Sequence, residues 1–251
     1  MAAKLKIPGE DGAPVLPPGF RLITLREKDD AFAEAMARGA EEGAGTLFWT
    51  RRFDHLEFAL VLEPDEPLET ARRAFYIGMN ALADALAAHC PPEKPLEFDW
   101  PDRMTFDRGL IGGGRLGWPD GAQEASPPEF LVFGGALRSV VMGGLEGRAL
   151  RDAASLETEG FEFIDHAALL ESFARHFLVQ TDEIREKGFK PLGQRYLARL
   201  PEEKNIRRGI DANGDLLIHA LPVKSPPKRL ALLPMLASPR WLDAETGQVL
   251  I

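Results

Sequence analysis

A run of glycines beside a charged residue is the part of the chain with the clearest capacity for chemistry. Gly112, Gly113 and Gly114 are consecutive, and Arg115 follows them directly. Glycines let backbone N–H groups approach a ligand without a Cβ atom in the way. The run lacks the Lys-Ser/Thr pair and the helix of a phosphate-binding loop. The glycines by themselves therefore favour a kinked or bulged strand near a ligand.

Three carboxylates precede the glycines, at Asp99, Asp102 and Asp107. Carboxylate oxygens are ligands that Mg²⁺ prefers in proteins. On an extended segment Asp99 and Asp107 need not converge, and Asp107-Arg108-Gly109 is typical of a turn. Asp102 is therefore the candidate for a metal contact.

The single cysteine, Cys90, stands in the sequence His89-Cys90-Pro91-Pro92. A thiol beside histidine is a possible nucleophile, but adjacency in sequence does not establish a catalytic pair. We interpret Cys90 as structural. A single cysteine also excludes an intramolecular disulfide and a cysteine-rich zinc site.

Composition and charge exclude several classes of function. The chain has 251 residues, of which 45% are hydrophobic and 27% charged, as in ordinary globular proteins. Its net charge of −9, from 39 acidic and 30 basic residues, argues against nucleic-acid binding. The N-terminus lacks the apolar core of a signal peptide, and no apolar stretch is long enough to span a membrane. We expect a cytoplasmic protein.

Apolar periodicity indicates the elements that position the glycines. The expected strands are 20–25, 46–49, 56–62, 96–100, 109–116, 129–141, 205–210, 215–220 and 247–251. The expected helices are one that runs to about residue 38 and is capped by Asp29 or Asp30, and those at 70–89, 165–187 and 191–200. The pattern predicts an α+β fold, with a mixed, largely antiparallel sheet, flanking helices and a small C-terminal β module. We divide the chain into a flexible arm (1–18), a main domain (19–200) and the C-terminal module (201–251).

Three features in this order resemble the biotin and lipoate protein ligase superfamily. A long amphipathic helix leads into a strand that ends in Trp100-Pro101, where the ligases carry a Lys-Trp-Pro-Asn-Asp type segment. A glycine-rich strand follows at 111–116, and residues 188–217 are similar to the helix and SH3-like hairpin that close the biotin ligases. The resemblance covers roughly residues 20–220 and implies a fold of the class II synthetase and biotin ligase type.

The resemblance also implies a chemistry. These enzymes use ATP and Mg²⁺ to activate a carboxylic acid as an acyl-adenylate, and then pass the acyl group to a lysine of a carrier protein. Cations stabilise the carboxylate and the α-phosphate, and apolar walls hold the ligand body. The implied ligand is biotin, lipoate or octanoate. The implied partner is a biotinyl or lipoyl carrier domain.

The sequence departs from the family pattern at two important positions. The Gly-Arg-Gly-Arg-x-Gly loop that folds over the adenylate is replaced by residues 46–52, TLFWTRR. The family lysine aligns at about Leu110, and no lysine lies between Lys94 and Lys187. Arg108 or Arg115 is the only cation that could replace this lysine, and the reach of arginine differs from that of lysine.

The resemblance implies a site around the glycine strand. Arg115 takes the anion-stabilising, catalytic role, and Asp102 takes a metal or ribose contact. The ligand-binding residues are Trp49, Arg51, Arg52, Trp100, Asp102, Arg103, Gly112, Gly113 and Gly114.

Three functions are compatible with this sequence. The first is a divergent ligase-like protein that binds a small carboxylic acid or its adenylate and, if active, attaches it to a carrier. The second is a non-catalytic module on the same scaffold that senses a ligand or binds a protein, which the missing lysine and loop support. The third is a structural interaction protein, in which the glycine strands pack shut.

Overall fold

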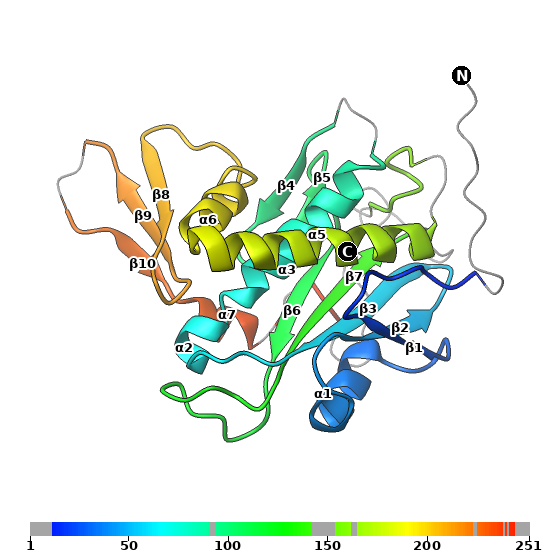
Figure 1. Cartoon of the computed structure of the whole chain (residues 1–251). Coiled ribbons are helices and arrows are strands. Elements are labelled where there is room, and N and C mark those ends of the chain that lie inside the picture. Colours follow the sequence, from blue (N-terminus) through cyan, green and yellow to red (C-terminus); the bar gives the residue numbers. More distant parts are fainter. Residues whose placement is uncertain are drawn as a thin grey trace.

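A computed structural model of the chain describes residues 12–90, 94–141, 154–161, 165–222, 225–237, 239 and 241–243 (Figure 1). It contains a large seven-stranded sheet with helices on both faces, and a separate three-stranded antiparallel sheet. The predicted α+β class is confirmed, with a mixed and largely antiparallel sheet and a small C-terminal β module. None of the helices in the described ranges is long and apolar enough to cross a membrane.

The strands of the large sheet lie in the order β1-β2-β3-β7-β6-β5-β4, in which β1 and β2 are parallel and the other neighbours are antiparallel. Their bounds are Arg21–Leu25 (β1), Thr46–Arg51 (β2), His55–Leu62 (β3), Leu96–Asp99 (β4), Arg103–Phe106 (β5), Gly109–Gly117 (β6) and Leu131–Arg138 (β7). β3 and β7 are buried along almost their whole length, as expected for strands covered on both faces.

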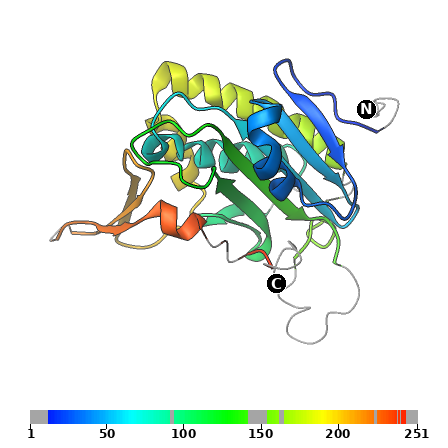
Figure 2. The same cartoon turned by 90° about the horizontal axis from the view of Figure 1, so that it is seen from below.

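Helices cover the two faces of the large sheet unequally. α3 (Ala74–Ala87) and α5 (His166–Lys187) cover one face, which we call the α5 face, and α6 (Lys190–Leu197) packs against both helices. α1 (Ala31–Glu42) covers part of the opposite face, which we call the α1 face. Figure 2 shows α5 and the C-terminal segment, drawn in red, on opposite sides of the sheet.

The main core lies between the large sheet and the α3–α5 pair. Phe58 and Phe133 reach it from the sheet and Phe173 from α5, and the ring centroids of Phe58 and Phe173 are 4.5 Å apart. Full burial of one such ring contributes roughly 1.5–3 kcal/mol to stability. α3 is apolar on nearly all sides, because it is enclosed between the sheet, α5 and α6.

The helix predicted for residues 70–89 is divided in the structure into α2 (Leu68–Ala71) and α3. At the junction, Arg73 Nε donates to the carbonyl of Thr70 at 2.9 Å, and Arg72 Nε donates to the carbonyl of Asn213 at 3.0 Å. The second contact joins the junction to the C-terminal sheet, which apolar spacing alone does not report.

The sequence predicts a turn at Asp107-Arg108-Gly109, and the structure forms it with φ values of 48° at Asp107 and 71° at Arg108. The strand before this turn, β5, is not among the predicted strands. β5 is only four residues long, although its alternating burial, with Met104 and Phe106 buried, is a strand signal.

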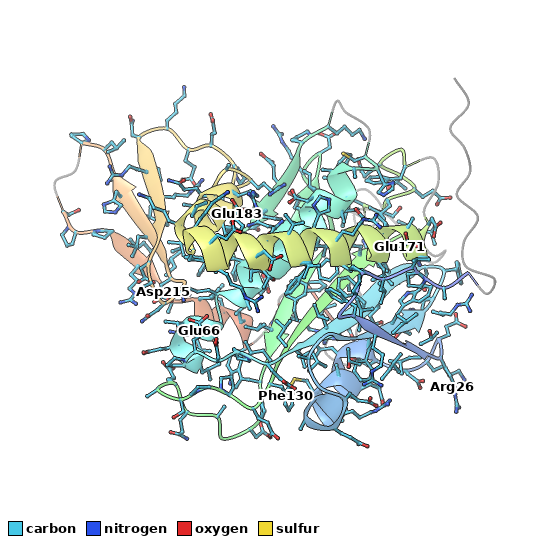
Figure 3. The ribbon with its side chains drawn as sticks, in the orientation of Figure 1. Arg26, Glu66, Phe130, Glu171, Glu183 and Asp215 are labelled. Carbon is cyan, nitrogen blue, oxygen red and sulfur yellow. The ribbon has the colours of Figure 1, made fainter. Side chains whose placement is uncertain are left out.

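The C-terminal sheet consists of β8 (Ile206–Ile210), β9 (Leu216–Ala220) and β10 (Lys228–Leu230), followed by α7 (Leu232–Leu236). The predicted hairpin at Asn213-Gly214 is confirmed, with a φ of 85° at Gly214. Asp215, labelled in Figure 3, accepts hydrogen bonds from Leu232 N–H at 2.9 Å and Arg229 Nε at 2.7 Å. The strand expected at 247–251 and residues 1–11 of the expected arm lie outside the described residues.

Candidate functional site

The glycine run lies in the middle of β6, where side-chain positions alternate between the two faces. An added Cβ on Gly114 would lie 2.6 Å from Met79 Sδ on the α5 face, whereas one on Gly113 would lie 2.8 Å from the Trp241 ring on the α1 face. The N–H of Gly114 donates to the carbonyl of Asp102 at 3.0 Å. Two of the three glycines therefore make room for packed side chains.

Gly112 is the point where β6 departs from regular pairing. Its φ is 154°, and the register with β5 shifts between Met104 and Thr105. An added Cβ would lie 2.0 Å from the carbonyl oxygen of Ala136, so only glycine allows β6 and β7 to approach this closely. This irregularity matches the bulged strand that the sequence predicts.

Arg115 is a partly buried cation on the α1 face. Its guanidinium donates to Asp30 Oδ1 at 3.0 Å and lies 4.0 Å from the centroid of the Phe32 ring. The Arg115 side chain is 19% exposed and that of Asp30 is 41% exposed. Burial lowers the pKa of Arg115, whereas the negative charges of Asp30 and Glu57 raise it. Arginine is so strongly basic that Arg115 stays protonated.

Asp30 and Glu57 both serve the N-terminus of α1. Asp30 Oδ1 accepts the N–H of Ala33 at 2.9 Å, and Glu57 Oε1 accepts the N–H of Ala31 at 3.0 Å. Free N–H groups at a helix start favour carboxylates. Burial and the nearby Asp30 raise the pKa of Glu57. Asp30, Glu57 and Arg115 form one group of charges, which we call the α1 cluster.

Asp102 and Trp241 meet near Gly113. Asp102 is 4% exposed, and burial raises the pKa of its carboxyl group to about 6, although the Trp241 indole and Arg103 lower it. Trp241 is fully buried against Ala136, with Leu110 and Leu242 beside them. Its indole N–H faces the carboxyl group of Asp102, although the pair does not reach regular hydrogen-bond geometry. An apolar ring therefore covers this part of the glycine strand.

Contacts with the helices of the α5 face hold the Trp-Pro segment. Trp100 Nε1 donates to the hydroxyl of Tyr76 on α3 at 3.3 Å. The hydroxyl of Tyr196 on α6 donates to the carbonyl of Pro101 at 2.5 Å. Arg103 forms an ion pair with Asp99. Trp100 and Arg103 are thus engaged by other residues of the chain.

Trp49, Arg51 and Arg52 line a different hollow. It has a volume of 580 Å³ and lies between the turn from β2 to β3 and the start of α5. Arg51 is 5.7 Å from the centroid of the Trp49 ring system, and Arg52 makes two hydrogen bonds to Asp54, at 3.0 and 2.8 Å. The structure does not bring these three residues to Arg115.

Four polar residues that are scattered in the sequence gather beside this hollow. His55 Nδ1 is 2.8 Å from Asp54, and His166 Nε2 is 2.5 Å from the hydroxyl of Ser139. Burial would raise the pKa of Asp54, but hydrogen bonds from Arg52 and His55 hold it well below its usual range. Burial lowers the pKa of both histidines. Ser139 is 1% exposed, so the Ser139–His166 pair joins β7 to α5 rather than presenting a nucleophile.

A more apolar cavity of 540 Å³ lies between α3, α5 and the loop from β3 to α2. Leu62, Ile77 and Phe177 contribute to its lining. It is on the α5 face and no residue of β6 lines it, so it is separate from the α1 cluster.

The described residues do not fit a magnesium–ATP group. They contain no group of three histidine, cysteine, aspartate or glutamate side chains that could hold a metal ion. Asp102 is buried beside Trp241, and Asp99 is paired with Arg103. Leu110, where the resemblance places the family lysine, packs against Trp241 and offers no charge.

Comparison with known proteins agrees with this fold and defines the family. Residues 16–198 match the model of the Biotin/lipoate A/B protein ligase family, and the chain belongs to that family. The chain is 24% identical over 217 residues to a biotin–[acetyl-CoA-carboxylase] ligase of Paracoccus denitrificans, which covers 80% of this chain and 84% of that enzyme.

Solved structures give the same result for the fold. A biotin protein ligase-like protein of unknown function from Silicibacter sp. TM1040 superposes with a TM-score of 0.75, at 24% identity, over 88% of this chain and 98% of that chain. The biotin protein ligase of Aquifex aeolicus gives a TM-score of 0.63, at 18% identity, over 84% and 95%. The Aquifex protein has also been solved in complex with biotin and ATP.

Proposed function

We propose that this chain is a ligand-binding member of the family that holds a small carboxylic acid at Arg115 without converting it to an adenylate. The pairing of Arg115 with Asp30 is the observation that carries the proposal. The guanidinium is partly buried, oriented and already bound to a carboxylate, and that carboxylate is the more exposed of the two. An incoming carboxylate can therefore replace Asp30 on a planar donor group suited to it.

The surroundings of Arg115 suit an acid with an apolar body. Phe32 lies over the guanidinium, and the sheet beside it carries the small residues Gly113 and Ala136, which the apolar ring of Trp241 covers. Biotin, lipoate and octanoate each combine a carboxylate with such a body. One relative, from Aquifex aeolicus, is described in complex with biotin.

The second candidate is ATP-dependent attachment of the acid to a biotinyl or lipoyl carrier domain. Similarity to the Paracoccus ligase favours it. The described residues favour it less, because Leu110 stands at the lysine position and β2 replaces the glycine-arginine loop. Each charged contact that is missing from such a site is worth roughly 3 kcal/mol of transition-state stabilisation.

Titration calorimetry with biotin, lipoate and octanoate, in the absence of ATP, tests the proposal. We expect the wild type to bind at least one acid, and Arg115→Gln to weaken that binding about tenfold or more, since a hydrogen bond to a charged group is worth about 1.5–3 kcal/mol. Arg185→Gln on the surface of α5 is the matched control and should not change the affinity. Equal affinities of the wild type and Arg115→Gln would contradict the proposal.

Release of AMP separates the two candidates. With ATP, Mg²⁺ and each acid present, we expect no AMP above the rate of a reaction without protein. AMP release that Arg115→Gln abolishes would favour the ligase instead.

A further inference from the structure

The ring of Trp241 covers β6 at a position close to Arg115. Gly113 and Arg115 are two residues apart on β6 and face the same side of the sheet, which separates them by about 7 Å. The Trp241 ring fills the space above Gly113. An acid whose carboxylate reached Arg115, and whose body followed β6 toward Gly113, would meet this ring.

Among the described residues, Trp241 packs against a small group of apolar side chains on the α1 face. The ring belongs to a small cluster with Ala136, flanked by Leu110 and Leu242, which is distinct from the main core on the α5 face. It reaches this place from the end of the described chain, after α7. The ring is therefore an addition to the sheet surface and not part of the interior that holds the two faces together.

The indole N–H of Trp241 is buried beside the carboxyl group of Asp102 and lowers the pKa of that group, but the two do not form a hydrogen bond of regular geometry. Buried polar groups are normally paired, and an unpaired one reduces the stability of the state that contains it. The carboxyl group of Asp102 is buried at the same place. The closed arrangement thus pairs the indole with the buried carboxyl group only imperfectly.

We propose that Trp241 is an internal gate, which occupies the subsite for the apolar body of the ligand and must leave Gly113 before the acid binds at Arg115. This inference rests on the proposed function, because it concerns the same site. In this account the structure shows the closed form of the protein, and the closed form does not bind the acid. Affinity is then reduced by the fraction of molecules in which Trp241 has moved.

Calorimetry on Trp241→Ala with octanoate as the probe tests the gate. If the open form makes up about 1–10% of the wild type, the variant should bind octanoate about 10- to 100-fold more tightly. Trp118→Ala, in the loop from β6 to β7, is the matched control and should bind as the wild type does. A folded Trp241→Ala protein that binds octanoate no more tightly than the wild type would overturn the gate.

Two further measurements distinguish a gate from a cavity that the Trp241→Ala substitution merely leaves empty. The double variant Trp241→Ala, Arg115→Gln should lose the gain in affinity, and octanol, which has no carboxylate, should not bind Trp241→Ala with the same gain. If the gain persists in the double variant or extends to octanol, the ring only filled space and the gate is wrong.

The wild type provides a readout that does not depend on the stability of a variant. After labelling with 5-fluorotryptophan, the ¹⁹F resonance of Trp241 is assigned by its loss in Trp241→Phe. Saturation with octanoate should shift this resonance toward that of exposed indole, while the Trp118 resonance stays in place. Binding at Arg115 with an unmoved Trp241 resonance would refute the gate alone, whereas no binding to the wild type or to Trp241→Ala would refute the proposed function as well.

Discussion

The carboxyl group of Asp102 illustrates how one residue on the α1 face responds to its surroundings. Burial raises its pKa to about 6, so the folded state binds this proton more tightly than the unfolded state. The associated stability is present below the unfolded pKa, near 3.8, and is lost as the pH rises through about 6. Asp102→Asn should therefore be more stable than the wild type at pH 7, by at most about 3 kcal/mol.

Urea denaturation of both proteins between pH 4 and 7 measures this effect. The difference in the free energy of unfolding, variant minus wild type, should grow up to about pH 6 and then level off. His55 and His166, whose pKa values burial lowers, act in the opposite direction but contribute equally to both proteins. A difference that does not depend on pH would show that Asp102 titrates normally.

Gly113 tests the close packing of the glycine strand. An added Cβ would lie 1.9 Å from the carbonyl oxygen of Asp102, which is backbone and cannot move aside cheaply. Gly113→Ala should lower the free energy of unfolding by about 2 kcal/mol or more. Gly209→Ala, on β8, meets no atom within 4 Å and should change it by less than about 0.5 kcal/mol. Equal effects in urea denaturation would contradict this packing.

At the residue scale, the sequence predicts some roles and misses others for identifiable reasons. A local pattern places the N-cap of α1 at Asp29 or Asp30, and the structure has it at Asp30. The partnership of Arg115 with Asp30 spans 85 positions, and no local pattern reports it. Trp241 shows no periodic signal, and its contact with Gly113 joins two residues that are far apart in the sequence.

Among the elements, α3 connects the Trp-Pro segment to the C-terminal sheet. The hydroxyl of Tyr76 donates to the carbonyl of Gly214 at 2.5 Å and accepts the indole N–H of Trp100. Tyr76→Phe leaves both groups without this partner, so we expect a loss of about 1–3 kcal/mol in thermal or urea unfolding. Unchanged stability would show that water or another group satisfies them.

Apolar periodicity predicts long elements better than short ones. It places β3, β7 and α5 correctly, because each has several consecutive apolar contacts with the same core. β5 and β10 are too short for their apolar alternation to stand out from the surrounding sequence. The separation of α2 from α3 depends on Arg72 and Asn213, which only the folded chain brings together.

For the whole molecule, the two sheets share one core. Leu216 of β9 and Leu232 and Leu236 of α7 are buried in the same cluster as Phe75 and Tyr76 of α3. We therefore predict that the two sheets unfold in a single transition. Far-ultraviolet circular dichroism and tryptophan fluorescence should give coincident urea curves, and a separate early transition would show that the C-terminal sheet unfolds independently.

The fold and the chemistry of this molecule were not equally predictable from the sequence. The Trp-Pro segment and the glycine strand carried enough of the family pattern to indicate the fold, which the family match and the related structures confirm. Successive side chains of a strand point to opposite faces of the sheet, so the face of each expected site residue is known only once the sheet has formed. In the folded sheet, Arg115 lies apart from Trp49 and Arg51. Family membership alone therefore does not fix the function.

The most direct test of acid binding at Arg115 is the affinity of Asp30→Asn for octanoate, measured by calorimetry without ATP. Asparagine keeps the N-cap of α1 but removes the charge that competes for the guanidinium, so we predict binding about five- to tenfold tighter than in the wild type. Asp29→Asn makes the same change of charge one position earlier and should have no such effect. Equal or weaker binding by Asp30→Asn would contradict the proposal that the acid replaces Asp30 at Arg115.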